Sequence, residues 1–126
     1  MHELAIANSI LDTVRTELAR HPGRYATKVG VRIGELTAVD QDSLRFCFEA
    51  ITLETDLDCL KLEIELVPRR QTCLACRCVF RVRDYEFGCP QCASLQTEFS
   101  SGDELELAYL EVEEYGASPV ATKGTD

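Results

Sequence analysis

The stretch CLACRCVFRVRDYEFGCPQC, residues 73–92, contains two C-x-x-C pairs separated by twelve residues. Each pair forms a tight turn that brings two sulfur atoms within reach of one ion, and two such turns complete a tetrahedron of thiolates. We therefore predict that Cys73, Cys76, Cys89 and Cys92 bind a structural Zn(II) in a small ribbon. Iron in a rubredoxin-like site uses the same four ligands, so the spacing alone leaves that alternative open. Because sulfur fills all four positions, none remains for a catalytic water.

Three further cysteines lie outside these pairs. A total of seven, an odd number, argues in a reducing compartment against a disulfide scaffold and for metal binding. Cys47 and Cys59 are expected to be small core residues, since unbridged cysteine is among the most buried residue types. Cys78 is a spare thiol that could exchange with Cys76, and we expect it to be free or partly buried. The sequence assigns no role to Cys47, Cys59 or Cys78.

Charge divides the chain into two parts. Residues 69–93 carry five arginines and two acidic residues, a net charge of +3, whereas the whole chain carries -9 and the remainder therefore -12. A basic piece within an acidic chain indicates a separate module. An acidic molecule repels phosphate, so nucleic acid is not expected as a partner. We expect the basic segment to meet an acidic protein surface instead.

Two helices are predicted before the ribbon. Apolar residues recur at helical spacing between Leu4 and Leu18, and this first helix is expected to end at His21, before a Pro-Gly pair. A second helix follows Asp40, the expected N-cap, and its apolar face begins at Leu44.

Alternating apolar and polar residues predict three strands, at residues 28–34, 60–67 and 104–113. The alternation of the third strand changes phase near Ala108, which either a β-bulge or burial on both faces would explain. We predict an α+β fold: a small mixed three-stranded sheet with two helices on one face, and the four-cysteine zinc ribbon inserted between its last two strands.

This arrangement divides the chain into three parts. Residues 1–68 and 94–115 form a discontinuous α/β domain, residues 69–93 form the zinc ribbon, and residues 116–126 form a mobile tail. No apolar run approaches the ~18 residues that span a membrane. Acidic residues interrupt the apolar residues at the start, unlike in a secretory signal. We therefore expect a cytoplasmic protein that does not act at a membrane.

The first three residues are candidates for a second metal site. The free amine of Met1, nearby main-chain nitrogens and the imidazole of His2 lie together where the first helix begins. Nitrogen donors in a plane suit Cu(II) or Ni(II), whereas Zn(II) prefers a tetrahedron. The chain has only one other histidine, His21, and it lacks a Gly-rich phosphate loop and a nucleophile motif. We therefore expect a binding protein and not an enzyme.

Four segments of the chain are characteristic in combination: MHE at residues 1–3, VRIGELTAVDQDSLRFCFEAIT at 31–52, LEIELVP at 62–68, and CLAC with CPQC in the ribbon. With these segments the chain resembles the HypA/HybF family of nickel chaperones in hydrogenase maturation. The resemblance implies that His2 is the essential Ni(II) ligand and that main-chain nitrogens of His2 and Glu3 join it, while the paired cysteines hold structural zinc.

The resemblance also implies a function and partners. Members of this family deliver Ni(II) to the hydrogenase large-subunit precursor together with a GTPase of the same pathway, and some also serve urease. The alternative is a zinc-ribbon module that binds protein or nucleic acid and has no nickel function. The basic segment favours this alternative, and the net charge of -12 on the remaining residues opposes it.

Overall fold

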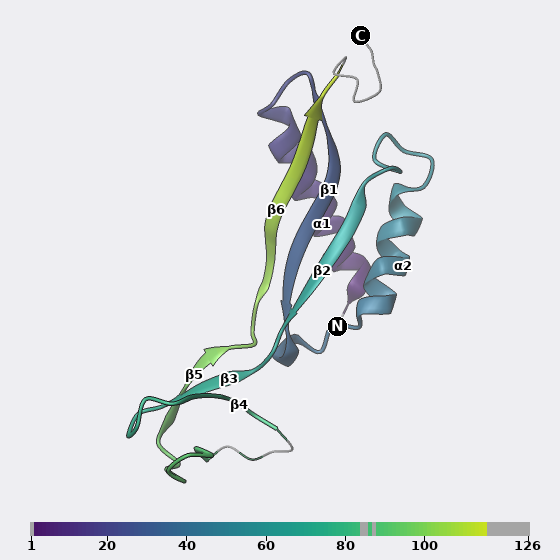
Figure 1. The fold of residues 1–126 in the computed structure, drawn as a ribbon. Coiled ribbons are helices and arrows are strands. Elements are labelled where there is room, and N and C mark those ends of the chain that lie inside the picture. Colours follow the sequence, from purple (N-terminus) through teal and green to yellow (C-terminus); the bar gives the residue numbers. More distant parts are fainter. Residues whose placement is uncertain (1, 84–85, 87, 116–126) are drawn as a thin grey trace. The chain divides into compact units, whose positions relative to one another are not determined.

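The computed structural model describes residues 2–83, 86 and 88–115 of the chain. Its elements in chain order are α1 (Glu3–Ala19), β1 (Arg24–Gly34), the 3-10 turn η1 (Glu35–Thr37), α2 (Gln41–Thr52), β2 (Lys61–Val67), β3 (Arg70–Cys73), β4 (Val79–Arg81), β5 (Thr97–Ser101) and β6 (Leu105–Glu114). The strands form two separate three-stranded sheets, ordered β2-β1-β6 and β4-β3-β5 (Figure 1). The predicted tail at residues 116–126 lies outside the described residues.

The first sheet is mixed, as predicted. The arrows of β1 and β2 run the same way in Figure 1, whereas β6 runs against β1. The Tyr115 N–H donates to the Gly23 carbonyl (2.9 Å), and the Gly34 N–H donates to the Glu104 carbonyl (2.7 Å). In an antiparallel pair without a bulge, the residue numbers of hydrogen-bonded partners add up to a constant, and these two pairs have the same sum. No extra residue is therefore inserted in β1 or β6 between them. A bulge would have shifted one pair against the other.

The phase change in β6 is therefore not caused by a bulge. Burial on both faces is confined to the point of the change, since Leu105 and Tyr109 on either side of it are exposed. Leu107 and Ala108 are neighbours that point to opposite faces, and both are half-buried. This settles the choice that the sequence left open, in favour of a continuous strand.

Both helices cover one face of the first sheet, as predicted (Figure 1). The buried side of α1 consists of Ala7, Ile10, Leu11 and Val14. Leu4 was expected on this side but is 51% exposed. It is the second residue of α1, in the first turn, which lies at the margin of the core. In α2, Leu44 and Phe48 are almost fully buried.

The start of α2 is fixed by the predicted N-cap. The Asp40 carboxylate accepts hydrogen bonds from the N–H groups of Asp42 (2.9 Å) and Ser43 (3.2 Å), two donors that have no acceptor within the helix. Asp40 is thereby held at the end of α2 where the chain enters the helix.

The second sheet contains a strand that the sequence did not predict, β5. It pairs antiparallel with β3 along Thr97–Ser101, and Leu36 N–H donates to the Gly102 carbonyl (2.8 Å). The chain accordingly splits into two compact units, one of residues 1–31, 39–64 and 107–126 and one of residues 32–38 and 65–106. The cysteine-bearing unit is larger than the predicted segment of residues 69–93, because β5 and the end of β1 pack with it.

Candidate metal sites

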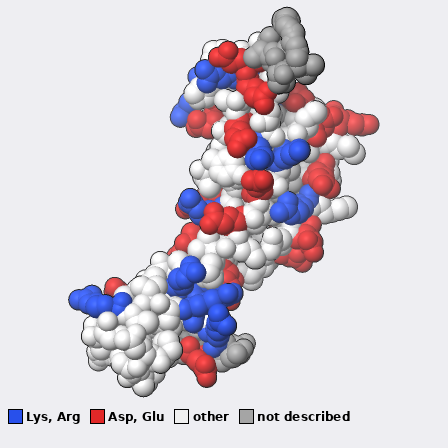
Figure 2. Space-filling view, in the orientation of Figure 1, with Lys and Arg blue, Asp and Glu red and all other residues white. Residues whose placement is uncertain are grey.

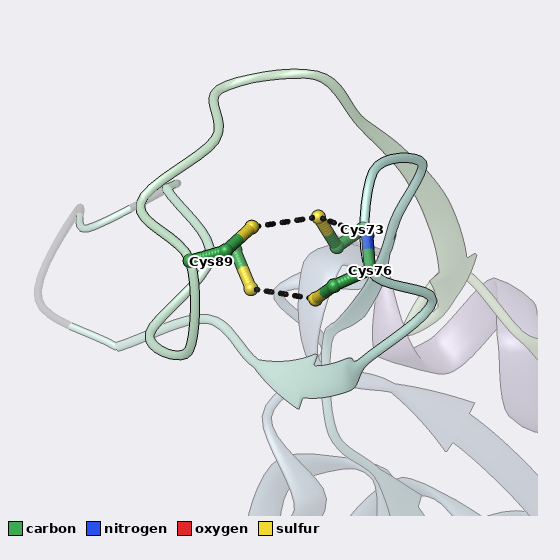
Figure 3. Close-up of side chains that lie close together, drawn as sticks. Cys73, Cys76 and Cys89 are labelled. Atoms are coloured by element: carbon green, nitrogen blue, oxygen red, sulfur yellow. Dashed lines mark hydrogen bonds between the residues drawn. The ribbon is translucent and has the colours of Figure 1, made fainter.

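The four paired cysteines converge on one point in the second unit. Each offers a sulfur atom, and the four sulfurs of Cys73, Cys76, Cys89 and Cys92 lie within 4.8 Å of one another. The Cys73 and Cys92 sulfurs are 3.5 Å apart and those of Cys76 and Cys89 are 3.6 Å apart, with no disulfide formed (Figure 3). A zinc ion with Zn–S bonds of about 2.3 Å places tetrahedral sulfurs about 3.8 Å apart. The cluster therefore fits Zn(II).

Two turns of the same conformation position these sulfurs. The Arg77 N–H donates to the Cys73 carbonyl (2.9 Å), and the Ala93 N–H donates to the Cys89 carbonyl (2.8 Å). Arg77 and Ala93 both have positive φ, 68° and 66°. The turns thus have the same conformation, as their common C-x-x-C spacing predicts, although CLACRC and CPQCAS share only their first and fourth letters.

Main-chain N–H groups point at the sulfurs from within each turn. The Cys76 N–H lies 3.5 Å from the Cys73 sulfur, and the Gln91 N–H lies 3.4 Å from the Cys89 sulfur. The Cys76 N–H is the main cause that lowers the pKa of the Cys73 thiol to about 6. Cys73 and Cys89 are buried in a small apolar core with Phe80 and Val82. The N–H donors favour the thiolate of Cys73, the form that binds metal, whereas burial in the apolar core opposes it.

The three other cysteines take different places. Cys78 is half-buried against the apolar core of the ribbon, in agreement with the expectation for a spare thiol. Cys47 is half-buried on α2. Cys59 was expected in the core but is exposed, because Leu57 and Leu60 on either side of it fill the core instead. The carboxylate of Asp58 raises the pKa of the Cys59 thiol.

The candidate site at the amino terminus lies in the first unit. His2 occupies the N-cap position of α1, is exposed, and makes no capping hydrogen bond with its side chain. The Ile6 N–H donates to the His2 carbonyl (3.1 Å), so the regular helical hydrogen bonds begin beyond the N–H groups of the first turn. Main-chain nitrogens of the first residues are thus not tied into the helix. Met1, the third predicted participant, lies outside the described residues.

The Glu3 side chain is already engaged. Its carboxylate accepts a hydrogen bond from the Asp40 N–H at 2.9 Å, a contact between the starts of α1 and α2. This N–H is the main cause that lowers the pKa of Glu3 below its usual value. Sequence reasoning identified Asp40 only as a helix cap and missed this contact, because no local pattern links residues 37 positions apart.

Comparisons with known proteins agree with these features. The family described as "Hydrogenase/urease nickel incorporation, metallochaperone, hypA" matches residues 1–112. The hydrogenase maturation factor HypA of Azotobacter chroococcum is 39% identical over 113 residues, covering 90% of this chain and 100% of that protein. The corresponding factor of Geobacter metallireducens has the same identity and the same coverage of both chains.

Solved structures show the same fold. The solution structure of the Ni metallochaperone HypA from Helicobacter pylori matches with a TM-score of 0.59 and 25% identity, over 88% of this chain and 97% of that one. A second HypA solution structure matches with a TM-score of 0.65 and 25% identity, over 88% and 95%. Among the described residues, neither α1 nor α2 has the length and apolarity that a membrane-spanning helix needs.

Proposed function

The chain belongs to the HypA family of nickel metallochaperones for hydrogenase and urease, and on that premise we propose that it binds Ni(II) at its amino terminus. The proposed donors are the imidazole and main-chain nitrogen of His2, the main-chain nitrogen of Glu3 and the amine of Met1. The observation that carries this assignment is the exposed His2 at the very start of α1, with no competing hydrogen bond from its side chain.

Glu3 contributes through its main chain in this proposal. Its carboxylate is held by the Asp40 N–H, so binding through the side chain would first require that hydrogen bond to break. The main-chain nitrogens can bind without breaking a helical hydrogen bond, although each must lose its proton to bind a metal. Four nitrogens in one plane would select Ni(II) over Zn(II) by geometry.

The four-cysteine cluster has a structural task in this proposal. Cys73, Cys76, Cys89 and Cys92 hold Zn(II), and a closed set of four thiolates leaves no position for substrate or water. The ion ties the two turns together and stabilises the small apolar core around Phe80 and Val82.

The family works in nickel incorporation into hydrogenase or urease. We propose that this chain receives or delivers Ni(II) in contact with a GTPase of that pathway and with the hydrogenase large-subunit precursor. We further propose that it acts in the cytoplasm, and by transfer of the ion and not by catalysis.

The test compares His2→Ala with His21→Ala, since His21 is also exposed and lies just beyond the other end of α1. Full-length, untagged protein is loaded with zinc and titrated with Ni(II), with the metal content measured by elemental analysis. We expect His2→Ala to lose stoichiometric nickel and keep about one zinc per chain, while His21→Ala keeps both. The bound Ni(II) should be diamagnetic, as planar nitrogen coordination requires. Wild-type nickel binding by His2→Ala, or a paramagnetic complex, would show that the site lies elsewhere.

A further inference from the structure

The second sheet separates its apolar and basic residues onto opposite faces. In β4 and the residue after it, Phe80 and Val82 are 7% and 8% exposed and pack into the core with Cys73 and Cys89. Side chains alternate along a strand, so Val79 and Arg81 point away from that core. Val79 is 58% exposed, and half of the Arg81 side chain is exposed.

Two further arginines extend this face. Arg70 of β3 is the direct antiparallel partner of Arg81, so the two side chains lie on the same face. Arg83 continues the alternation two residues beyond Arg81 and is exposed. We call Arg70, Arg81 and Arg83, together with Val79, the arginine face. Figure 2 shows Lys and Arg side chains gathered on this unit, whereas positive and negative side chains are interleaved on the first unit.

The face keeps a net positive charge, since three arginines lie beside two carboxylates: Glu86 is the antiparallel bridge partner of Arg83, and Glu35 lies near Arg81. Among the described residues, the one ion pair of these three arginines joins Arg81 to Glu35, at 4.0 Å. Like charges directly opposite each other in a sheet are destabilising, and Arg70 and Arg81 occupy just such a pair of positions. By contrast, Arg15, Arg20 and Arg24 of the first unit each have a carboxylate within 3.5 Å.

We propose that the arginine face docks an acidic stretch of a partner protein. Arg81 and Arg83 are two residues apart and therefore about 6.5 Å apart along the strand direction, which matches carboxylates at alternate positions of an extended segment. Arginine binds carboxylates through paired hydrogen bonds, and Val79 adds an apolar contact. The -12 charge of the rest of the chain repels such a segment elsewhere and steers it to this face. This surface goes beyond the proposed nickel site and does not depend on it.

The test uses two variants with the same change in net charge. Arg70→Glu, Arg81→Glu and Arg83→Glu are combined in one, and Arg15→Glu, Arg20→Glu and Arg24→Glu in the other. The probes are a fluorescein-labelled twelve-residue peptide alternating Glu and Val, the same peptide with Gln for Glu, and a twelve-nucleotide oligothymidylate. Zinc-loaded full-length protein is titrated into each probe, and fluorescence anisotropy is read at ~0.05 M and ~0.15 M salt.

We expect the wild type to bind the Glu peptide more tightly than the Gln peptide and the oligonucleotide. The face variant should bind the Glu peptide about tenfold or more weakly, since three exposed ion pairs are lost and replaced by repulsion. The first-unit variant should stay within about threefold of the wild type. Equal weakening of binding in both variants would show that net charge alone causes the effect, and it would overturn the proposal. Tighter binding of the oligonucleotide than of the Glu peptide would overturn it in favour of a nucleic-acid surface.

Zinc and nickel content are measured on every variant. A face variant that keeps one zinc has an intact ribbon, and its nickel content reports on the amino-terminal site independently of docking. If the three Glu substitutions release zinc, the same positions are changed to Gln, which removes charge without adding repulsion. Undiminished peptide binding by that zinc-loaded Gln variant would also overturn the proposal.

Discussion

Removal of zinc should unfold the second unit and leave the first one folded. Within the part of the ribbon that the structure describes, Phe80 and Val82 are the buried apolar side chains besides cysteine, and burial of such side chains stabilises by about 1.5–3 kcal/mol each, or about 3–6 kcal/mol together. Structural zinc contributes about 10–16 kcal/mol in small metal-dependent domains at neutral pH. The metal term is therefore the larger by a factor of about two or more. The first unit has its own core, with Val14, Leu44 and Phe48 almost fully buried.

Cys89→Ser provides the perturbation and Cys78→Ser the matched control. Cys89 belongs to the sulfur cluster, whereas Cys78 packs against the same core outside it. Elemental analysis should show about one zinc per chain for Cys78→Ser and a marked loss for Cys89→Ser. In amide NMR spectra of Cys89→Ser, Phe80 and Val82 should lose their dispersed signals while Val14 and Phe48 keep theirs. Zinc loss in Cys78→Ser would make that thiol a ligand, and loss of the Val14 and Phe48 signals would refute the independence of the two cores.

Three further predictions concern the scaffold around the two sites. Gly34→Ala should destabilise the fold by about 1–3 kcal/mol, because a Cβ there would stand 2.1 Å from the Gly102 carbonyl oxygen. Gly88→Ala is the control, since its Cβ would lie 3.3 Å from the end of a leucine side chain and 3.7 Å or more from main-chain oxygens; equal urea midpoints for the two variants would contradict the prediction. Asp40→Ala should cost about 1 kcal/mol in urea unfolding through loss of the helix cap, while Asp40→Asn should retain most of it. The Asp40 N–H is the main cause that lowers the Glu3 pKa, so this contact stabilises the folded state at pH values above 4.5, the ordinary pKa. The stabilisation is lost as the pH falls through the lower pKa of the folded state. A carbon-13 NMR titration that gives Glu3 a pKa of 4.5 or higher would contradict this.

Local patterns predicted most of the fold. The alternation of residues 60–67, the cap at Asp40 and the apolar spacing of α1 each specify an element without reference to the rest of the chain, and each is confirmed. The two C-x-x-C pairs likewise predicted that four sulfurs would meet. For the strand, the cap and the helix, the determining contacts lie within a few residues, which is the range that sequence periodicity reports.

The features that sequence analysis missed depend on contacts between distant segments. β5 lacks a clear alternation of its own and is a strand because it pairs with β3 about 25 residues earlier. The exposure of Cys59 follows from which neighbouring leucines fill the core. The arginine face required the register of β3 against β4, since the charge count located the basic segment but not the side on which its arginines gather.

The two proposed metal sites are built for opposite kinetic behaviour. The zinc ligands come from two separate turns, and two of the four sulfurs are buried, so release of the ion requires the turns to part and the Phe80 core to open. The proposed nickel donors come from consecutive residues at an exposed chain end, where His2 can leave the metal by rotation of its side chain without disturbing α1. Nickel can therefore pass to a partner by stepwise ligand exchange while zinc stays in place. It follows that a chelator of moderate strength should strip nickel from the doubly loaded protein and leave zinc bound, and simultaneous loss of both ions would contradict this separation.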